Sequence, residues 1–134
     1  MEQPAAYFGF TNASTSACWV QGYPTVEFFD GAGRRVDAAE RRGSSYQIAD
    51  PGPARIALAP QTTGWFGVGW GGANPPNMDL VGCVSPAAVQ VVPPNGTQKM
   101  RLPVHLRSGV CPRGGLIVTA IGLRQSFPLA DPEG

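Results

Sequence analysis

Charge is scarce in this chain. Only 14% of its 134 residues are charged, and the formal net charge is +1. Lys99 is the single lysine, and the arginine pairs at 34–35 and 41–42 stand close to acidic side chains. A nucleic-acid-binding surface needs a cluster of unopposed positive charge. We therefore expect no nucleic-acid partner.

Long apolar runs and targeting signals are also lacking. No apolar run approaches the roughly 18 residues that a membrane-spanning helix needs. The first ten residues, MEQPAAYFGF, have neither the basic nor the apolar segment of a secretory signal peptide. Two interpretations stay open at this point: a cytosolic protein that begins at Met1, or a mature extracytoplasmic domain whose leader is absent from this chain.

Residues suited to catalysis are equally few. His105 is the only histidine, and alternation places it on the strand face opposite Val104 and Leu106, with Ser108 as the only nucleophile close in sequence. The nine acidic residues are scattered over predicted loops. The three cysteines form no C-x-x-C pair that would bind a metal together with His105. We expect no enzyme activity, no metal and no cofactor.

Turn-forming residues and short alternating segments are abundant instead. The chain holds 18 Gly and 14 Pro, and several segments alternate with the period of two that is typical of half-buried strands. Strands are predicted around residues 8–10, 18–20, 26–28, 56–59, 65–70, 87–92, 99–106 and 116–121. Residues 36–53 are predicted to form a loop, in which 37–42 fit at most one helical turn.

About eight strands with regular turn signals predict one all-β domain, a sandwich or a barrel. Its core is expected to span residues 5–122, followed by a flexible tail at 123–134. The residues predicted to face inward are Phe8, Phe10, Cys18, Val20, Val26, Phe28, Leu58, Phe66, Val68, Trp70, Val89, Val91, Leu102, Val104, Ile117, and Thr119 or its neighbours Val118 and Ile121.

The segment from Trp65 to Pro76 is the predicted recognition site, because long irregular loops often carry function. Its glycines match the pattern G-x-G-x-x-G, but the prolines that follow cannot begin the helix that a dinucleotide site needs. The candidate ligand-binding residues are Trp65, Trp70, Asn74, Pro75 and Pro76. Trp65 has two interpretations: an exposed platform, or a ring that lies over Gly67 and fills the space there.

Several motifs resemble one known family. T-N-A-S at 11–14, A-C-W-V-Q-G-Y-P at 17–24 and V-E-F-F-D at 26–30 are similar to the signature of the actinobacterial domain of unknown function 4232, found in secreted proteins and lipoproteins. I-A-L-A-P at 56–60 and V-Q-V-V-P-P at 89–94 are also similar to its motifs. The resemblance covers about residues 7–121. It implies an immunoglobulin-like antiparallel β-sandwich, with no established activity or ligand.

Cys83 and Cys111 are the predicted disulfide pair. They flank two strands that, if joined as an antiparallel hairpin, bring both cysteines together at its open end. Cys18 is expected to be a free thiol, because the first cysteine of the family has no counterpart in this chain. A Cys18–Cys83 bridge and three unpaired thiols are the alternatives. A disulfide implies an oxidising compartment.

The favoured functional hypothesis is an extracytoplasmic, secreted or lipid-anchored binding module. Its expected partner is an unknown protein or a cell-envelope glycan, since sandwiches present loops and edge strands for recognition. A cell-wall carbohydrate-binding module, resting on Trp19, Trp65 and Tyr7, is the alternative. An accessory domain of an enzyme is a third hypothesis.

Overall fold

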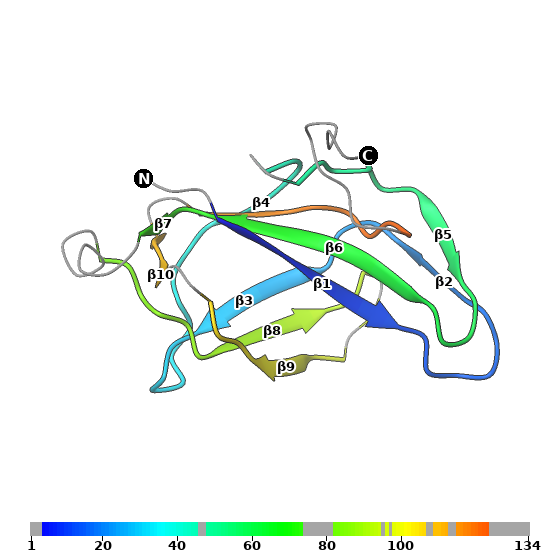
Figure 1. The fold of residues 1–134 in the computed structure, drawn as a ribbon, viewed down its shortest axis with the longest axis horizontal. Helices are drawn as coiled ribbons and strands as arrows, with labels where there is room; N and C mark the ends of the chain where they lie inside the picture. The colour runs from blue at the N-terminus through cyan, green and yellow to red at the C-terminus, as the bar shows by residue number, and fades with distance from the viewer. Residues whose placement is uncertain are drawn as a thin grey trace, which may run out of the picture.

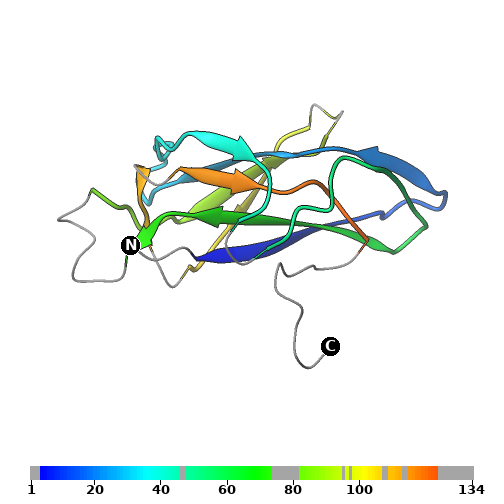
Figure 2. The ribbon, with the colours of Figure 1, turned by 90° about the horizontal axis from the view of Figure 1, so that it is seen from above.

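The computed structural model shows an all-β protein (Figures 1 and 2). It describes residues 4–45, 48–73, 82–94, 96, 98–106, 109–112 and 115–123. These residues form β1 (Ala5–Thr11), β2 (Cys18–Gln21), β3 (Thr25–Phe29), β4 (Glu40–Arg42), β5 (Arg55–Leu58), β6 (Thr63–Trp70), β7 (Gly72–Ala73), β8 (Ala88–Val92), β9 (Met100–Pro103), β10 (Gly109–Val110) and β11 (Leu116–Val118). The predicted tail beyond residue 123 lies outside the described residues.

Two packed sheets make up the body of the fold. One has the strand order β1-β6-β11-β4 and the other has the order β3-β8-β9. Two short antiparallel pairs, β2 with β5 and β7 with β10, lie beside them. This is the predicted β-sandwich, and the sheets do not close into a barrel.

The strand β4 corrects the prediction of a loop or helical turn at residues 37–42. It pairs with β11 in the parallel direction, whereas the other pairs among the described strands are antiparallel. The amide of Leu116 donates to the carbonyl of Ala39, and the amide of Gly43 donates to the carbonyl of Val118. Hydrogen bonds to a strand more than seventy residues away in the chain therefore decide the conformation of this polar segment.

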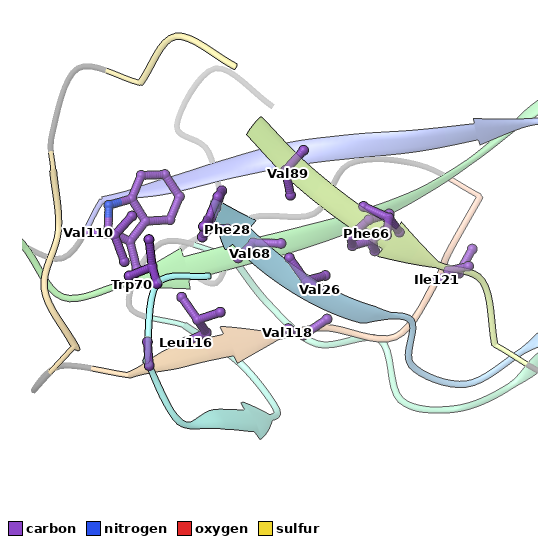
Figure 3. Close-up of a cluster of buried hydrophobic side chains, with 13 residues drawn as sticks. Val26, Phe28, Phe66, Val68, Trp70, Val89, Val110, Leu116, Val118 and Ile121 are labelled. Carbon is purple, nitrogen blue, oxygen red and sulfur yellow. The ribbon is translucent and has the colours of Figure 1, made fainter. Parts of the chain in front are cut away.

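The core lies between the two sheets (Figure 3). Phe66, Val68 and Trp70 point into it from β6, as their alternation predicted, and the ring of Trp70 meets the ring of Phe28 edge-on at 5.8 Å. The other buried apolar residues of this cluster are Val26, Val36, Ala38, Val89, Val91, Val110, Leu116, Val118 and Ile121. Both sheets thus contribute alternate residues to one hydrophobic layer.

Two inward assignments are wrong. Leu102 is 51% exposed, although its cross-strand neighbour Val89 is fully buried, because β9 is the outermost strand of its sheet. In the continuous apolar run of β11, Leu116 and Val118 enter the core while Ile117 is only half-buried. A run without alternation carries no information about which face is inside.

Asn12 is the principal buried polar side chain in the turn that follows β1. Its Nδ2 donates to the carbonyls of Leu58 and Ser16 at 2.8 and 2.9 Å, and its Oδ1 accepts from the amide and hydroxyl of Ser14. The side chain therefore ties the β1–β2 turn to the end of β5. This role explains the Asn of the T-N-A-S motif.

Replacing Asn12 with Ala should destabilise the protein by about 2–4 kcal/mol, because a buried carbonyl loses its donor and the turn loses its acceptor. Urea unfolding of wild-type and variant proteins measures this loss. Ser14→Ala is the matched control, since it removes only hydrogen bonds near the surface, and it should cost less than about 1 kcal/mol. Equal losses for the two variants would contradict the role given to Asn12.

Candidate functional site

Trp65 lies on the outer face of the first sheet and is partly buried there. Its register partner on β1 is Gly9, and a Cβ added to Gly9 would lie 3.2 Å from the indole ring. The ring therefore fills the space left by a glycine, as one of the two interpretations required. The glycine is Gly9, however, and not Gly67.

Gly67 is covered by a different residue. A Cβ placed on it would lie 2.6 Å from Ile48, which is 3% exposed, and one on Gly69 would lie 2.6 Å from Ser45. The segment between β4 and β5 thus crosses the outer face of β6. Gly67 and Gly69, two of the three glycines of the G-x-G-x-x-G pattern, accommodate this crossing, so this part of β6 offers no open surface to a ligand.

Asp50 fixes that crossing segment. Its Oδ2 accepts a hydrogen bond of 2.6 Å from the Tyr23 hydroxyl, and its Oδ1 accepts from the amides of Gly52 and Ala120 at 3.0 Å. The hydrogen bond to Asp50 raises the pKa of Tyr23 above its usual value, because it stabilises the protonated hydroxyl. One carboxylate therefore joins the segment to the β2–β3 corner and to the chain after β11.

The predicted recognition residues do not come together in the described part of the chain. Trp70 is 5% exposed and belongs to the core, so its ring is not available to a ligand. The described residues offer its indole N–H no hydrogen-bond acceptor. Asn74, Pro75 and Pro76 lie outside the described residues. Of the two candidates that the structure describes, Trp65 reaches the surface in part and Trp70 does not.

Among the residues that the structure describes, the largest exposed aromatic side chain is that of Trp19 on β2. It is 58% exposed, and the guanidinium carbon of Arg55 on β5 lies 4.2 Å from the centre of its ring. Beside it, the amide of the Gln21 side chain donates to the carbonyl of Pro53. An exposed tryptophan stacked with an arginine combines the two residue types most enriched in binding hot spots. Alternation in the sequence placed Trp19 away from the core, but nothing local indicated Arg55 as its neighbour.

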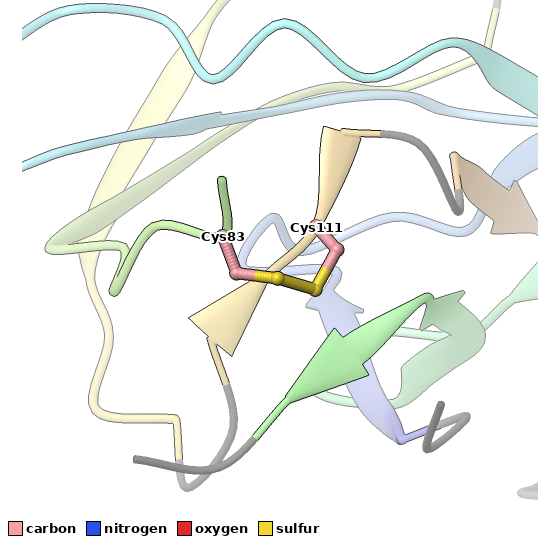
Figure 4. Close-up of a disulfide and its surroundings, with 2 residues drawn as sticks. All are labelled: Cys83 and Cys111. Carbon is pink, nitrogen blue, oxygen red and sulfur yellow. A yellow bond between two sulfur atoms is a disulfide. The ribbon is translucent and has the colours of Figure 1, made fainter. Parts of the chain in front are cut away.

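Cys83 and Cys111 form a disulfide, with Cα atoms 4.0 Å apart (Figure 4). Next to them, Val84 and Val110 exchange two backbone hydrogen bonds, which continue the β8–β9 hairpin toward its open end. This is the pair and the hairpin geometry that the sequence predicted. Cys18 is unpaired and partly buried. Closing a loop of 28 residues stabilises a fold by about 3.5 kcal/mol in the chain-entropy model.

The described residues contain no cluster of side chains able to hold a metal ion. His105 is solvent-exposed. Within the same residues there is no helix long and apolar enough to cross a membrane. The features that remain for recognition are the Trp19–Arg55 pair and the edges of the sheets.

By its fold, the protein belongs to the class of disulfide-bonded β-sandwich domains, and it carries an exposed tryptophan–arginine pair. Residues 1–122 match the model of one family, described as "Domain of unknown function (DUF4232)". The chain belongs to this family, which confirms the resemblance found in the sequence motifs. No curated protein and no solved structure matches the chain.

Replacing Trp65 with Ala should lower the free energy of unfolding by about 2 kcal/mol, because the ring covers Gly9 and part of its surface is buried. The sequence alone allowed a different result, in which the variant keeps its stability and loses only binding. Urea unfolding distinguishes the two. Trp65→Phe, which keeps a ring over Gly9, is the control and should retain most of the stability. An unchanged stability for Trp65→Ala would show that the ring is a free platform.

Proposed function

We propose that this protein is a non-enzymatic binding module that works outside the cytoplasm, either secreted or lipid-anchored. The observation that carries the proposal is the Trp19–Arg55 pair, a large exposed apolar ring held in place by a cation. A tryptophan that is not needed for packing and is fixed by a neighbour loses little entropy when a partner covers it. The partner is a protein or a cell-envelope glycan.

The Cys83–Cys111 disulfide supports the location outside the cytoplasm. Structural disulfides persist in oxidising compartments and are rare where thiols are kept reduced. Both cysteines are buried, so the bond is part of the packed fold and is shielded from reductants. A secreted or anchored protein would keep it throughout its life.

Protein isolated from its native cells, with free thiols blocked at lysis, should contain the Cys83–Cys111 linkage and one blocked thiol at Cys18. Mass mapping of a non-reduced digest reads this directly, and cell fractionation of a tagged full-length protein gives its location. A cytoplasmic fraction that is free of periplasmic material serves as the reference for the location. Protein recovered from the cytoplasm with all three cysteines blocked would overturn the proposed location.

A carbohydrate ligand is the second candidate, and Trp19 is the observation that favours it. The apolar face of a sugar ring can stack on an exposed indole ring, because both surfaces are then removed from water. Arg55 would add hydrogen bonds to hydroxyl or carboxylate groups of the sugar. Trp65 does not extend this surface, because it lies over Gly9 in a different sheet. A glycan site would therefore be centred on one ring.

Trp19→Ala should weaken binding to the physiological partner at least fivefold, which corresponds to about 1 kcal/mol at a hot spot. Binding isotherms on intact cells and on purified cell-wall polysaccharide measure this. Leu102→Ala is the matched control, since Leu102 is exposed to a similar degree on another sheet. Both variants should keep their unfolding free energy within about 0.5 kcal/mol. Equal binding by wild type and Trp19→Ala would refute a role for the pair.

A further inference from the structure

The short strands β2 and β5 pair at one end of the sandwich, away from β7 and β10 (Figure 1). In their register Trp19 lies opposite Ala57, and Gln21 lies opposite Arg55. Alternation along a strand places these four side chains on one face of the pair, and all four residues are exposed. The other face turns inward, since Leu58 is 2% exposed. The outward face is therefore a small surface with one indole, one guanidinium, one amide and one methyl group.

Arg55 is an isolated charge in this part of the chain. Residues 3–26 contain no charged side chain, and Arg55 is the only charged residue between positions 51 and 78. In the part of the chain that the structure describes, the ion pairs join Arg35 to its two acidic neighbours, beside β3 in the other sheet. The positive charge on the outward face of β2 and β5 is thus not compensated by a carboxylate of the described residues.

Arg101 shows how an arginine over an aromatic ring is satisfied elsewhere in the fold. Its guanidinium carbon lies 3.8 Å from the centre of the Phe29 ring, and the guanidinium also donates to the side chain of Gln90. Arg55 lies over the ring of Trp19 in the same way, but none of the described residues accepts a hydrogen bond from its guanidinium. A guanidinium has five N–H donors. Those of Arg55 are directed to an acceptor that comes from outside the protein.

We propose that the outward face of β2 and β5 binds a polysaccharide that carries carboxylate groups, with one uronic acid ring on Trp19 and its carboxylate on Arg55. This inference rests on the proposed binding function and names the class of its ligand. A uronic acid joins the apolar face of a sugar ring directly to a carboxylate. The protein groups that match these two parts are equally close, since the guanidinium carbon lies 4.2 Å from the centre of the indole ring.

The open part of the indole provides the place for the sugar ring. An indole is larger than a guanidinium, and Trp19 is 58% exposed even with Arg55 over its ring. A sugar on the open part of the indole lies beside the guanidinium, which then donates to both oxygens of the carboxylate. Stacking removes apolar surface of the sugar and of the indole from water. The charged hydrogen bonds add the preference for a carboxylate over a neutral hydroxyl group.

Neutral polar residues around the pair favour a sugar over an acidic protein segment. The turn that leads into β2, residues 12–17 with the sequence N-A-S-T-S-A, contains hydroxyl groups and no charge, and residues 13–17 are exposed. A segment with several acidic side chains would need a cluster of cations for electrostatic complementarity. One cation among hydroxyl and amide groups matches a ligand that has one carboxylate and several hydroxyls on each ring.

NMR titration of the ¹⁵N-labelled full chain with trigalacturonate, up to about 10 mM, tests the proposal. The indole N–H signal of Trp19, assigned by its loss in Trp19→Phe, should shift on binding. The galactose trisaccharide with the same linkages has hydroxymethyl groups in place of the carboxylates, and it should bind about fivefold more weakly or worse. Equal binding of the two trisaccharides overturns the choice of a carboxylated ligand, but leaves the glycan-binding function in place.

Arg55→Gln should remove this preference, so that the variant binds the two trisaccharides within about twofold of each other. Arg101→Gln is the matched control, since it also takes an arginine from an aromatic ring but in the other sheet, and it should keep the preference of the wild type. Raising the salt from about 50 mM to about 500 mM should weaken the binding of trigalacturonate to the wild type but not to Arg55→Gln. A preference that survives in Arg55→Gln overturns the role given to Arg55.

Two further outcomes separate this inference from the proposed function. If triglutamate binds as tightly as trigalacturonate, the ligand is an acidic peptide and the assignment to a sugar is wrong. If neither trisaccharide shifts the Trp19 signal, the inference is wrong, whereas the binding module stands as long as Trp19→Ala weakens binding to intact cells. Failure of both measurements overturns the inference and the proposed function together.

Discussion

Close contact between the backbone of β6 and the side chains around it is the constraint on which the fold depends. A Cβ added at Gly64 would lie 2.7 Å from Ile121 on the core side, and one at Gly67 would lie 2.6 Å from Ile48 on the outer side. Separations under 3.0 Å force the neighbours to move. β6 is therefore hydrogen-bonded along both edges and covered on both faces, which these positions allow only as glycines.

The cover over β6 depends in turn on a single carboxylate. Asp50 holds the segment between β4 and β5 against the sheet through Tyr23, Gly52 and Ala120, and this keeps Ile48 in position over Gly67. Because this segment covers the outer face of the central strand β6, the sandwich is three layers deep at this place. The exposed aromatic surface therefore lies on the β2–β5 pair, at Trp19 and Arg55, and not on β6.

The sequence predicted the structure correctly for strands that turn only one of their two faces toward the core. The alternation of Phe66, Val68 and Trp70 with glycines predicted the inward face of β6, and the turn between β8 and β9 predicted the meeting of Cys83 and Cys111. Both features depend on neighbours in the chain. The motifs at 11–30 also identified the family, and in the first of them the Asn12 side chain bonds to the buried carbonyl of Leu58.

The remaining features depend on contacts between distant residues, which no local pattern contains. The polar segment of β4 becomes a strand only because β11 supplies hydrogen bonds. Ile48, in a segment without periodicity, is buried because it meets Gly67. Leu102 has the alternation of a core residue but stands on the outermost strand. For the same reason, no local pattern around Trp65 indicated that Gly67 and Gly69 lie against the side chains of Ile48 and Ser45.

The disulfide also sets how the chain responds to mechanical tension. Cys83 and Cys111 are separated by 28 positions, and the chain between them contains β8 and β9. Pulling on the two ends of the chain cannot extend this loop, so about 100 Å of contour length stays hidden at full extension. The hairpin of β8 and β9 is thereby shielded from the load, while β1, β6 and the strands outside the loop bear it. A protein that links a partner to a surface gains from such a hairpin, because part of its core remains tethered after the rest has been stretched.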